Sequence, residues 1–225
     1  MPLPADLQGN TVAVVTSIYL HGFASSPQSS KAIRVAEALR PLGITTQIPD
    51  LNQPSFRDMT VTRMIDRVRE AADGPLLLVG SSLGAFVAVN AAAKVADVRG
   101  IVLLAPAFDF GADDDGKIGE VSIADWKARG SCEIFHYAWE RTETLDYALY
   151  EDAHRYDAFA LDLAMPVLVF QGTRDTVVDP AVVRRWCDGR PNVRLIELDD
   201  DHQLQASIDL ICEETAAFAR AIAPR

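Results

Sequence analysis

The sequence predicts an α/β fold in which one doubly wound, mostly parallel sheet is covered by helices, as a single domain over residues 1–225. Three observations favour this fold class. Short apolar segments alternate with segments of helical periodicity. A Gly-x-Ser-x-Gly turn joins one apolar segment to a helix. The hydrophobic content of 49% over 225 residues is enough to fill a large core without disulfides or metals.

The expected strands are apolar segments of the length typical of buried parallel strands. They cover residues 12–20, 44–48, 76–79, 100–104, 167–170 and 193–198. Segments with helical periodicity or helix start signals alternate with them. These cover residues 30–39, 60–72, 85–95, 180–188 and 205–221. Functional residues of such a sheet are expected in the loops beyond the carboxyl ends of its strands.

Residues 107–160 interrupt this alternation, and we expect them to form a small, mostly helical lid inserted into the domain. They include 13 acidic and five basic residues and therefore carry −8 of the net charge of −11. They also hold 10 of the 17 aromatic residues of the chain. Trp126, Phe135, Tyr137 and Trp139 are candidates for the apolar walls of a binding site. The alternative for each of them is that it packs the segment against the body of the domain.

Composition excludes several classes of protein. A net charge of −11 argues against nucleic acid as a partner. The chain has no apolar run of membrane-spanning length, and its first residues lack the pattern of a signal peptide. Cys132, Cys187 and Cys212 are odd in number and lack C-x-x-C spacing, which predicts free thiols. Together these features predict a cytoplasmic protein that acts on a small molecule and not at a membrane.

The most informative motif is Gly80-Ser81-Ser82-Leu83-Gly84. An apolar strand precedes it and a segment of small, helix-permissive residues follows it. Strand, sharp turn and helix form the setting in which Gly-x-Ser-x-Gly exposes a serine hydroxyl above the edge of a sheet. The motif therefore predicts Ser82 as a nucleophile. The alternative is a turn rich in glycine and serine that only binds a ligand or closes the fold.

A serine hydroxyl needs a base within hydrogen-bond reach and an acid that orients this base. In sheets of this kind the chain order is serine, acid, histidine. His202 follows the last expected strand and is therefore the predicted base. Asp175, directly after the strand at 167–170, is the predicted acid. Its competitor Asp179 precedes Pro180, which is the pattern of a helix N-cap.

Acyl transfer also needs hydrogen-bond donors for the oxyanion that develops in the transition state. The expected donors are the backbone N–H groups of Phe23, which follows His21-Gly22 at the end of the first strand, and of Leu83. His21 lies before the serine in the chain, so we expect it to hold the loop and not to act as the base. No metal or cofactor is expected.

Four segments resemble the YqiA/YcfP-like branch of the α/β-hydrolase superfamily. They are Tyr19-Leu20-His21-Gly22-Phe23-Ala24-Ser25-Ser26-Pro27, Lys31-Ala32, Pro49-Asp50-Leu51-Asn52-Gln53-Pro54-Ser55-Phe56 and the serine motif. The resemblance implies a sheet without the usual first antiparallel hairpin and an esterase-like activity. This chain differs at Ala85, where the family often has a second glycine. Its acid loop is also closer to that of α/β-hydrolases in general.

The sequence therefore favours a serine hydrolase that cleaves carboxylic esters or thioesters of small, neutral, moderately apolar substrates through an acyl-enzyme. A C–C bond hydrolase or a lyase that uses the same three side chains is an alternative, because fold does not determine chemistry. Two further alternatives are a non-catalytic relative that acts as a binding module, and a protein-interaction surface formed by the acidic, aromatic segment.

Overall fold

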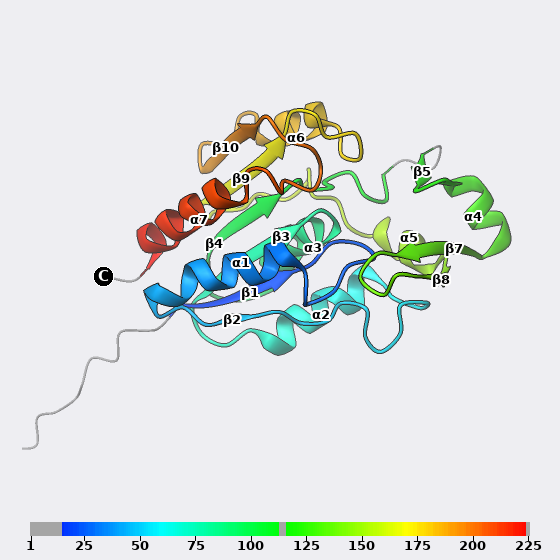
Figure 1. Ribbon diagram of the computed structural model, residues 1–225, viewed down its shortest axis with the longest axis horizontal. Helices are drawn as coiled ribbons and strands as arrows, with labels where there is room; N and C mark the ends of the chain where they lie inside the picture. The colour runs from blue at the N-terminus through cyan, green and yellow to red at the C-terminus, as the bar shows by residue number, and fades with distance from the viewer. Residues whose placement is uncertain (1–14, 113–115, 224–225) are drawn as a thin grey trace, which may run out of the picture.

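The computed structural model describes residues 15–112 and 116–223. Six parallel strands form its central sheet, in the order β10-β9-β4-β3-β1-β2 (Figure 1). Their bounds are Thr16–Leu20 (β1), Thr46–Gln47 (β2), Leu76–Ser81 (β3), Val98–Leu104 (β4), Val167–Gly172 (β9) and Val193–Leu198 (β10). The predicted α/β class is confirmed, and all six strands run parallel. Residues 12–14 of the first expected strand lie outside the described residues.

Helices cover both faces of the sheet, and each face has its own core cluster. Helices α1 (Ser30–Leu39) and α7 (Ile208–Ile222) pack on one face. Helices α2 (Val61–Ala71), α3 (Leu83–Ala92) and α6 (Pro180–Cys187) pack on the other. A short 3₁₀ helix, Arg40–Leu42, extends α1. The inner strands β1, β3, β4 and β9 are buried on both sides, which explains their continuous apolar runs, whereas the edge strands β2 and β10 are partly exposed.

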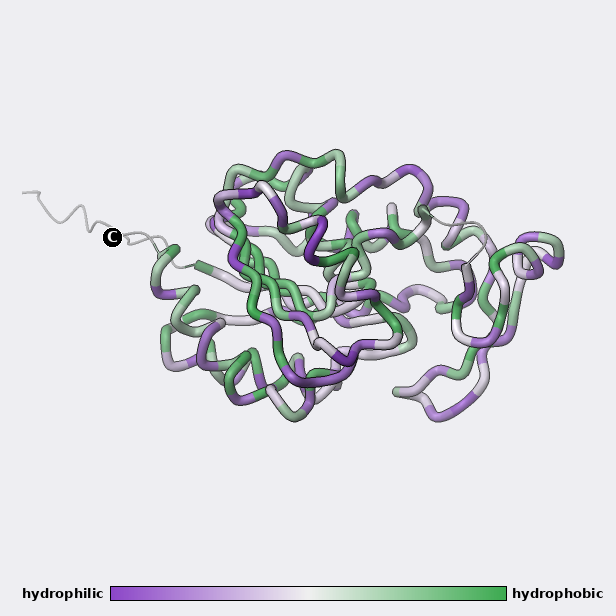
Figure 2. Tube along the Cα trace, turned by 90° about the horizontal axis from the view of Figure 1, so that it is seen from above, coloured by the Kyte–Doolittle hydropathy of each residue, from purple (hydrophilic) through white to green (hydrophobic). Residues whose placement is uncertain are grey.

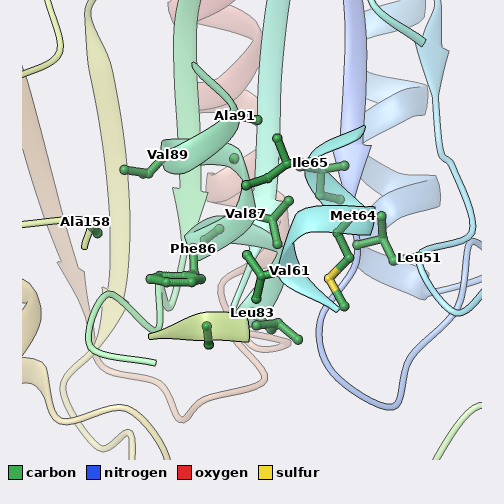
Figure 3. Packing of buried hydrophobic residues seen from close by; sticks show 14 of the residues in the cluster. Leu51, Val61, Met64, Ile65, Leu83, Phe86, Val87, Val89, Ala91 and Ala158 are labelled. Carbon is green, nitrogen blue, oxygen red and sulfur yellow. The ribbon is translucent and has the colours of Figure 1, made fainter. Parts of the chain in front are cut away.

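Helix α3 is the most deeply buried helix, since all ten of its residues are buried. Figure 3 shows its Phe86 and Val87 beside Val61 and Ile65 of α2. Residues of such a helix must be apolar on every side, as the sequence from Leu83 to Ala92 is apart from Asn90. The Asn90 amide donates to the Phe86 carbonyl within the helix. This packing fixes the first turn of α3 relative to the sheet.

The insertion, residues 107–160, lies beyond the carboxyl ends of the strands (Figure 1). It contains two antiparallel hairpins and two short helices. These are β5 (Lys117–Ile118), β6 (Val121–Ser122), α4 (Ile123–Arg129), β7 (Ser131–His136), β8 (Arg141–Asp146) and α5 (Ala148–Ala153). Residues 113–115 of the insertion are outside the described residues.

The expectation of a mostly helical insertion is wrong, because part of this segment has the two-residue period of a strand. Along β7, Cys132, Ile134 and His136 are buried, while Glu133 and Phe135 are exposed. A single face is therefore buried, as in a hairpin laid on a surface. Figure 2 shows polar and apolar residues mixed along the insertion, whereas hydrophobic residues dominate the central strands.

No helix in the described part of the chain has the length and apolar character that crossing a bilayer requires.

The contact between α3 and β1 predicts the cost of a side chain at Gly84. A Cβ atom there would lie 2.1 Å from the Leu20 carbonyl oxygen, which no rotamer can relieve. Alanine normally stabilises a helix relative to glycine by about 1 kcal/mol. We nevertheless expect Gly84→Ala to lower the free energy of unfolding by about 3 kcal/mol, because this overpacking involves backbone atoms. Urea denaturation measures the change.

Gly119→Ala is the matched control. Gly119 has a φ of +57° and no atom within 4 Å of the position of a Cβ, so alanine meets only backbone strain there. The expected loss is about 1 kcal/mol. Equal losses in the two variants would contradict the close contact between α3 and β1.

Candidate active site

Ser82 lies in the sharp turn between β3 and α3. Its backbone has φ 53° and ψ −117°, outside the regions that L-residues ordinarily occupy. Its N–H donates to the Leu104 carbonyl at the end of β4, 2.9 Å away. The turn closes tightly because Gly80 and Gly84 meet without side chains: a Cβ on Gly80 would lie 2.5 Å from the Gly84 oxygen. Ser82 is half-buried in this strained turn, as is typical of the serine in a Gly-x-Ser-x-Gly turn between a strand and a helix.

The structure brings Ser82, His202 and Asp175 together from three separate loops. The Ser82 Oγ lies 3.1 Å from the His202 Nε2. The His202 Nδ1 lies 2.8 Å from the Asp175 Oδ2. Since an ionised carboxylate can only accept, Nδ1–H donates to Asp175 and Nε2 is free to accept the serine proton. An arrangement of this kind is the one that activates the serine nucleophile in enzymes with a Ser-His-Asp triad.

The loop after β9 orients the Asp175 carboxylate with several donors. Its Oδ1 accepts from the N–H groups of Val177 and Val178 at 2.8 and 2.9 Å. Its Oδ2 accepts from the Gln171 amide at 3.0 Å as well as from His202. Burial acts to raise the pKa of Asp175, but the hydrogen bonds from His202 and the backbone outweigh it and hold the pKa below its usual range. The group therefore stays a fixed, ionised acceptor near neutral pH.

Asp179 has a different position and role. Its Oδ1 accepts from the Ala181 N–H at 2.8 Å, and Pro180 is the first residue of α6. Asp179 is therefore the N-cap of α6, as the sequence predicts. Only Asp175 of the two candidates contacts His202.

The loop after β1 lies directly against the nucleophile turn. A Cβ on Gly22 would be 3.4 Å from the Ser81 oxygen and 3.5 Å from the Ser82 Cβ. Phe23 follows in this loop, and Leu83 begins α3, where N–H groups lack acceptors within the helix. These two residues stay the predicted oxyanion donors.

His21 holds this loop in place, as predicted. Its Nδ1 lies 3.0 Å from the Gly22 oxygen, and its Nε2 accepts from the Leu51 N–H at 3.1 Å. Both ring nitrogens are therefore engaged by the backbone of the loops, and the Asp50 carboxylate lies 3.6 Å from Nε2. His21 is therefore a structural residue.

The insertion contacts the loop after β1 through the turn between β7 and β8. The Ala138 N–H donates to the Ala24 oxygen at 3.4 Å. Behind this contact the buried His136 ring stacks on Trp139, with centroids 3.8 Å apart, and meets the edge of Phe56 at 4.9 Å. Phe56 in turn lies 5.7 Å from Phe23. A continuous aromatic contact therefore joins the insertion to the predicted oxyanion loop.

The four aromatic residues singled out in the insertion have different environments. Trp126 is fully buried within the insertion and donates to the Leu145 oxygen at 3.0 Å, so it is not a wall of a binding site. Trp139 packs on His136. Phe135 and Tyr137 are 49% and 74% exposed and touch each other, with ring centroids 5.5 Å apart. Of the four, Phe135 and Tyr137 are therefore the most accessible to a ligand or partner.

The sequence predicts no site role for two residues near the site, Gln171 and Lys31. Gln171, at the end of β9, positions Asp175, and a short apolar strand gives no signal for such a contact. Lys31 is buried in the first turn of α1. The sequence pattern does predict that Lys31 is buried, since it shares the apolar face of α1 with Val35 and Leu39 at intervals of four residues.

The described residues contain no group of three or more His, Cys, Asp or Glu side chains placed to hold a metal ion. The three cysteines form no disulfide.

The sheet order, the serine turn and the positions of the acid and histidine loops define the α/β-hydrolase fold. A family profile described as an uncharacterised protein family, UPF0227, matches residues 16–219. The chain belongs to this family. No curated protein sequence matches it significantly.

Three solved structures illustrate the similarity of fold. Est1E from Butyrivibrio proteoclasticus, with ferulic acid bound, matches with a TM-score of 0.82 and 17% identity, over 95% of this chain and 91% of its own. A protein from Agrobacterium vitis S4 matches with a TM-score of 0.78 and 25% identity, over 94% and 88%. The esterase domain of a Rhodothermus marinus protein matches with a TM-score of 0.68 and 20% identity, over 96% and 90%.

The contacts of the two aspartates predict different effects of removing their charges. Asp175→Asn presents an amide to His202 and disturbs the imidazole tautomer, so the reactivity of Ser82 should fall about 10²–10⁴-fold. Asp179→Asn is the control, because asparagine is itself a good N-cap and should change reactivity and stability little. The rate of labelling by a fluorophosphonate measures both variants. A larger loss at Asp179 than at Asp175 would overturn the assignment.

Proposed function

We propose that this protein is a serine hydrolase that cleaves carboxylic esters or thioesters through an acyl-enzyme. The observation that carries the proposal is the continuous hydrogen bonding from Ser82 Oγ through His202 to Asp175. Similarity to an esterase domain and to Est1E supports hydrolysis as the class of reaction. Est1E holds ferulic acid, an aromatic carboxylic acid, which is the kind of product that a carboxylic ester releases.

In the first half of the reaction, Ser82 Oγ attacks the substrate carbonyl while His202 Nε2 takes its proton. Asp175 accepts from Nδ1–H and stabilises the imidazolium that forms. The N–H groups of Phe23 and Leu83 donate to the oxyanion. His202 then gives the proton to the leaving alcohol or thiol as the bond to the acyl carbon breaks.

The second half repeats these steps with water. His202 Nε2 takes a proton from a water molecule, which attacks the acyl carbon and forms a second oxyanion. Collapse of this intermediate returns the proton to Ser82 Oγ and releases the carboxylic acid. The His202 side chain, 14% exposed, is accessible to such a water.

The insertion supports a preference for neutral, moderately apolar substrates. It carries most of the net negative charge of the chain and lies at the edge of the sheet where Ser82 lies. Negative charge at an entrance repels anions at long range. Exposed Phe135 and Tyr137 offer apolar surface near the same edge. We therefore assign the insertion the role of a lid that selects against anionic esters.

A C–C bond hydrolase and a lyase use similar nucleophiles, and a binding module needs none. The strained Ser82 backbone favours catalysis over binding, because such strain persists where a site requires it. Stoichiometric labelling by a fluorophosphonate separates an enzyme from a binding module. A panel of p-nitrophenyl esters and acyl thioesters then identifies the bond that is cleaved.

The proposal predicts that Ser82→Ala folds normally and loses about 10⁴-fold or more of its ester hydrolysis. Ser81→Ala is the neighbouring control and should lose far less, because Ser81 is the buried last residue of β3. Rates with a p-nitrophenyl ester and thermal melting curves measure both variants. Full activity in Ser82→Ala, or loss in Ser81→Ala alone, would contradict the proposal.

The acidic insertion predicts a salt-dependent selectivity. At low ionic strength kcat/KM should be higher for a neutral ester than for an anionic ester of equal acyl length. The difference should narrow between about 0.01 M and about 1 M salt, where the Debye length falls from about 30 Å to about 3 Å. A higher kcat/KM for the anionic ester at low salt would reveal a basic pocket and exclude the assigned role of the insertion.

A further inference from the structure

Among the described residues, the buried side chains of Lys, Arg, Asp and Glu are Lys31, Asp175 and Asp200. Burying an isolated ionised group costs several kcal/mol or more unless other charges or hydrogen bonds compensate it. One buried cation and two buried anions in a single region can compensate one another's charge. Asp175 belongs to the candidate site, and Asp200 is two residues before His202.

Lys31 is close to the loop that carries His202. The Gln205 side chain donates to the Ser30 Oγ at 3.3 Å, so the first turn of α1 lies against this loop. Asp200 shapes the loop from inside, because its carboxylate accepts from the N–H groups of Asp201 and Ser207, both at 2.8 Å. The buried lysine and the buried loop carboxylate therefore belong to one region of the fold.

Lys31 is 7% exposed, and its side chain forms no hydrogen bond or ion pair with any other described residue. Burial lowers its pKa to about 8, against the opposing negative charges of Asp175, Asp201 and Asp200. At neutral pH most Lys31 is therefore protonated. Its charge acts on these acids through space and not through a direct contact.

We propose that the Lys31 ammonium is a positioning charge for the candidate active site, which balances the Asp175 and Asp200 carboxylates and keeps His202 neutral and able to accept a proton. The inference rests on the proposed function and adds a residue to it. A positive charge near an imidazole disfavours the imidazolium, whereas the two carboxylates favour it. Lys31 thus allows a buried, acid-rich site to keep a working base near neutral pH.

The arginines near the loop are exposed and already paired with other acids. Arg174 contacts the Asp199 carboxylate at 2.8 Å and the Asp199 carbonyl at 2.9 Å. On the solvent side of α1, Arg34 pairs with Asp209 of α7. Exposed pairs are screened by water and salt. The exposed Asp201 adds negative charge, which increases the need for a cation.

The experiment measures the rate at which a fluorophosphonate labels Ser82 from pH 5 to pH 9 in the wild type, Lys31→Met, Lys31→Arg and Lys94→Met. The acid limb of this profile reports protonation of the base. Lys31→Met keeps the apolar stem and removes the charge, so the midpoint of the limb should rise by about 0.5 to 1 pH unit. Lys31→Arg should keep the wild-type midpoint. Lys94→Met, on the surface near Tyr156, is the charge-matched control and should have no effect.

A midpoint in Lys31→Met equal to that of the wild type would overturn the proposal, as would a loss of rate by the same factor at every pH, which indicates a structural role.

A second measurement does not depend on whether Lys31→Met folds. The ¹⁵N signals of the His202 ring in the wild type should show an inflection near pH 8, where Lys31 loses its proton, and Lys31→Arg should remove it. A flat signal would contradict the proposal. A wild type that fails to label at all would instead contradict the proposed function.

Discussion

The close approach of helix α3 to the end of strand β1 is the constraint on which the candidate site depends. Only a residue without a side chain fits at Gly84, where the Leu20 and His21 carbonyl oxygens touch the first turn of α3. This approach places the free N–H groups of the helix start beside the loop that carries Phe23. It also forces Ser82 into a conformation with positive φ. The predicted nucleophile and the predicted oxyanion donors therefore share one structural cause.

A second constraint is electrostatic. The carboxylate that orients His202 is buried, and its charge is tolerated because backbone N–H groups, Gln171 and His202 itself donate to it. A carboxylate held in this way also favours a positive charge on its neighbour. The buried ammonium of Lys31 opposes this tendency. The site is in this view a balance of buried charges as well as a set of hydrogen bonds.

Sequence reasoning succeeds where a local pattern has one structural solution. The glycines around Ser82 require a sharp turn between a strand and a helix. His202 follows from chain order. Asp179 is distinguished from Asp175 because Pro180 follows it, which is the pattern of a helix N-cap. The insertion is less predictable, because hairpins as short as β5–β6 bury too little of one face to give a clear period. Lys31 depends on tertiary context, since the acids that surround it come from loops about 140 to 170 residues later in the chain.

Trapping of the acyl-enzyme is the most direct test of nucleophilic attack by Ser82. The protein is mixed with a p-nitrophenyl ester, quenched in acid within milliseconds to seconds, and its intact mass is measured. The account predicts one added acyl group for each chain, located by fragmentation of the tryptic peptide 70–94 on Ser82 and not on Ser81. The same adduct should accumulate to a higher level in Asp175→Asn if deacylation becomes the slower step. Ester hydrolysis with no covalent adduct in either protein, or an adduct on another residue, would contradict the account.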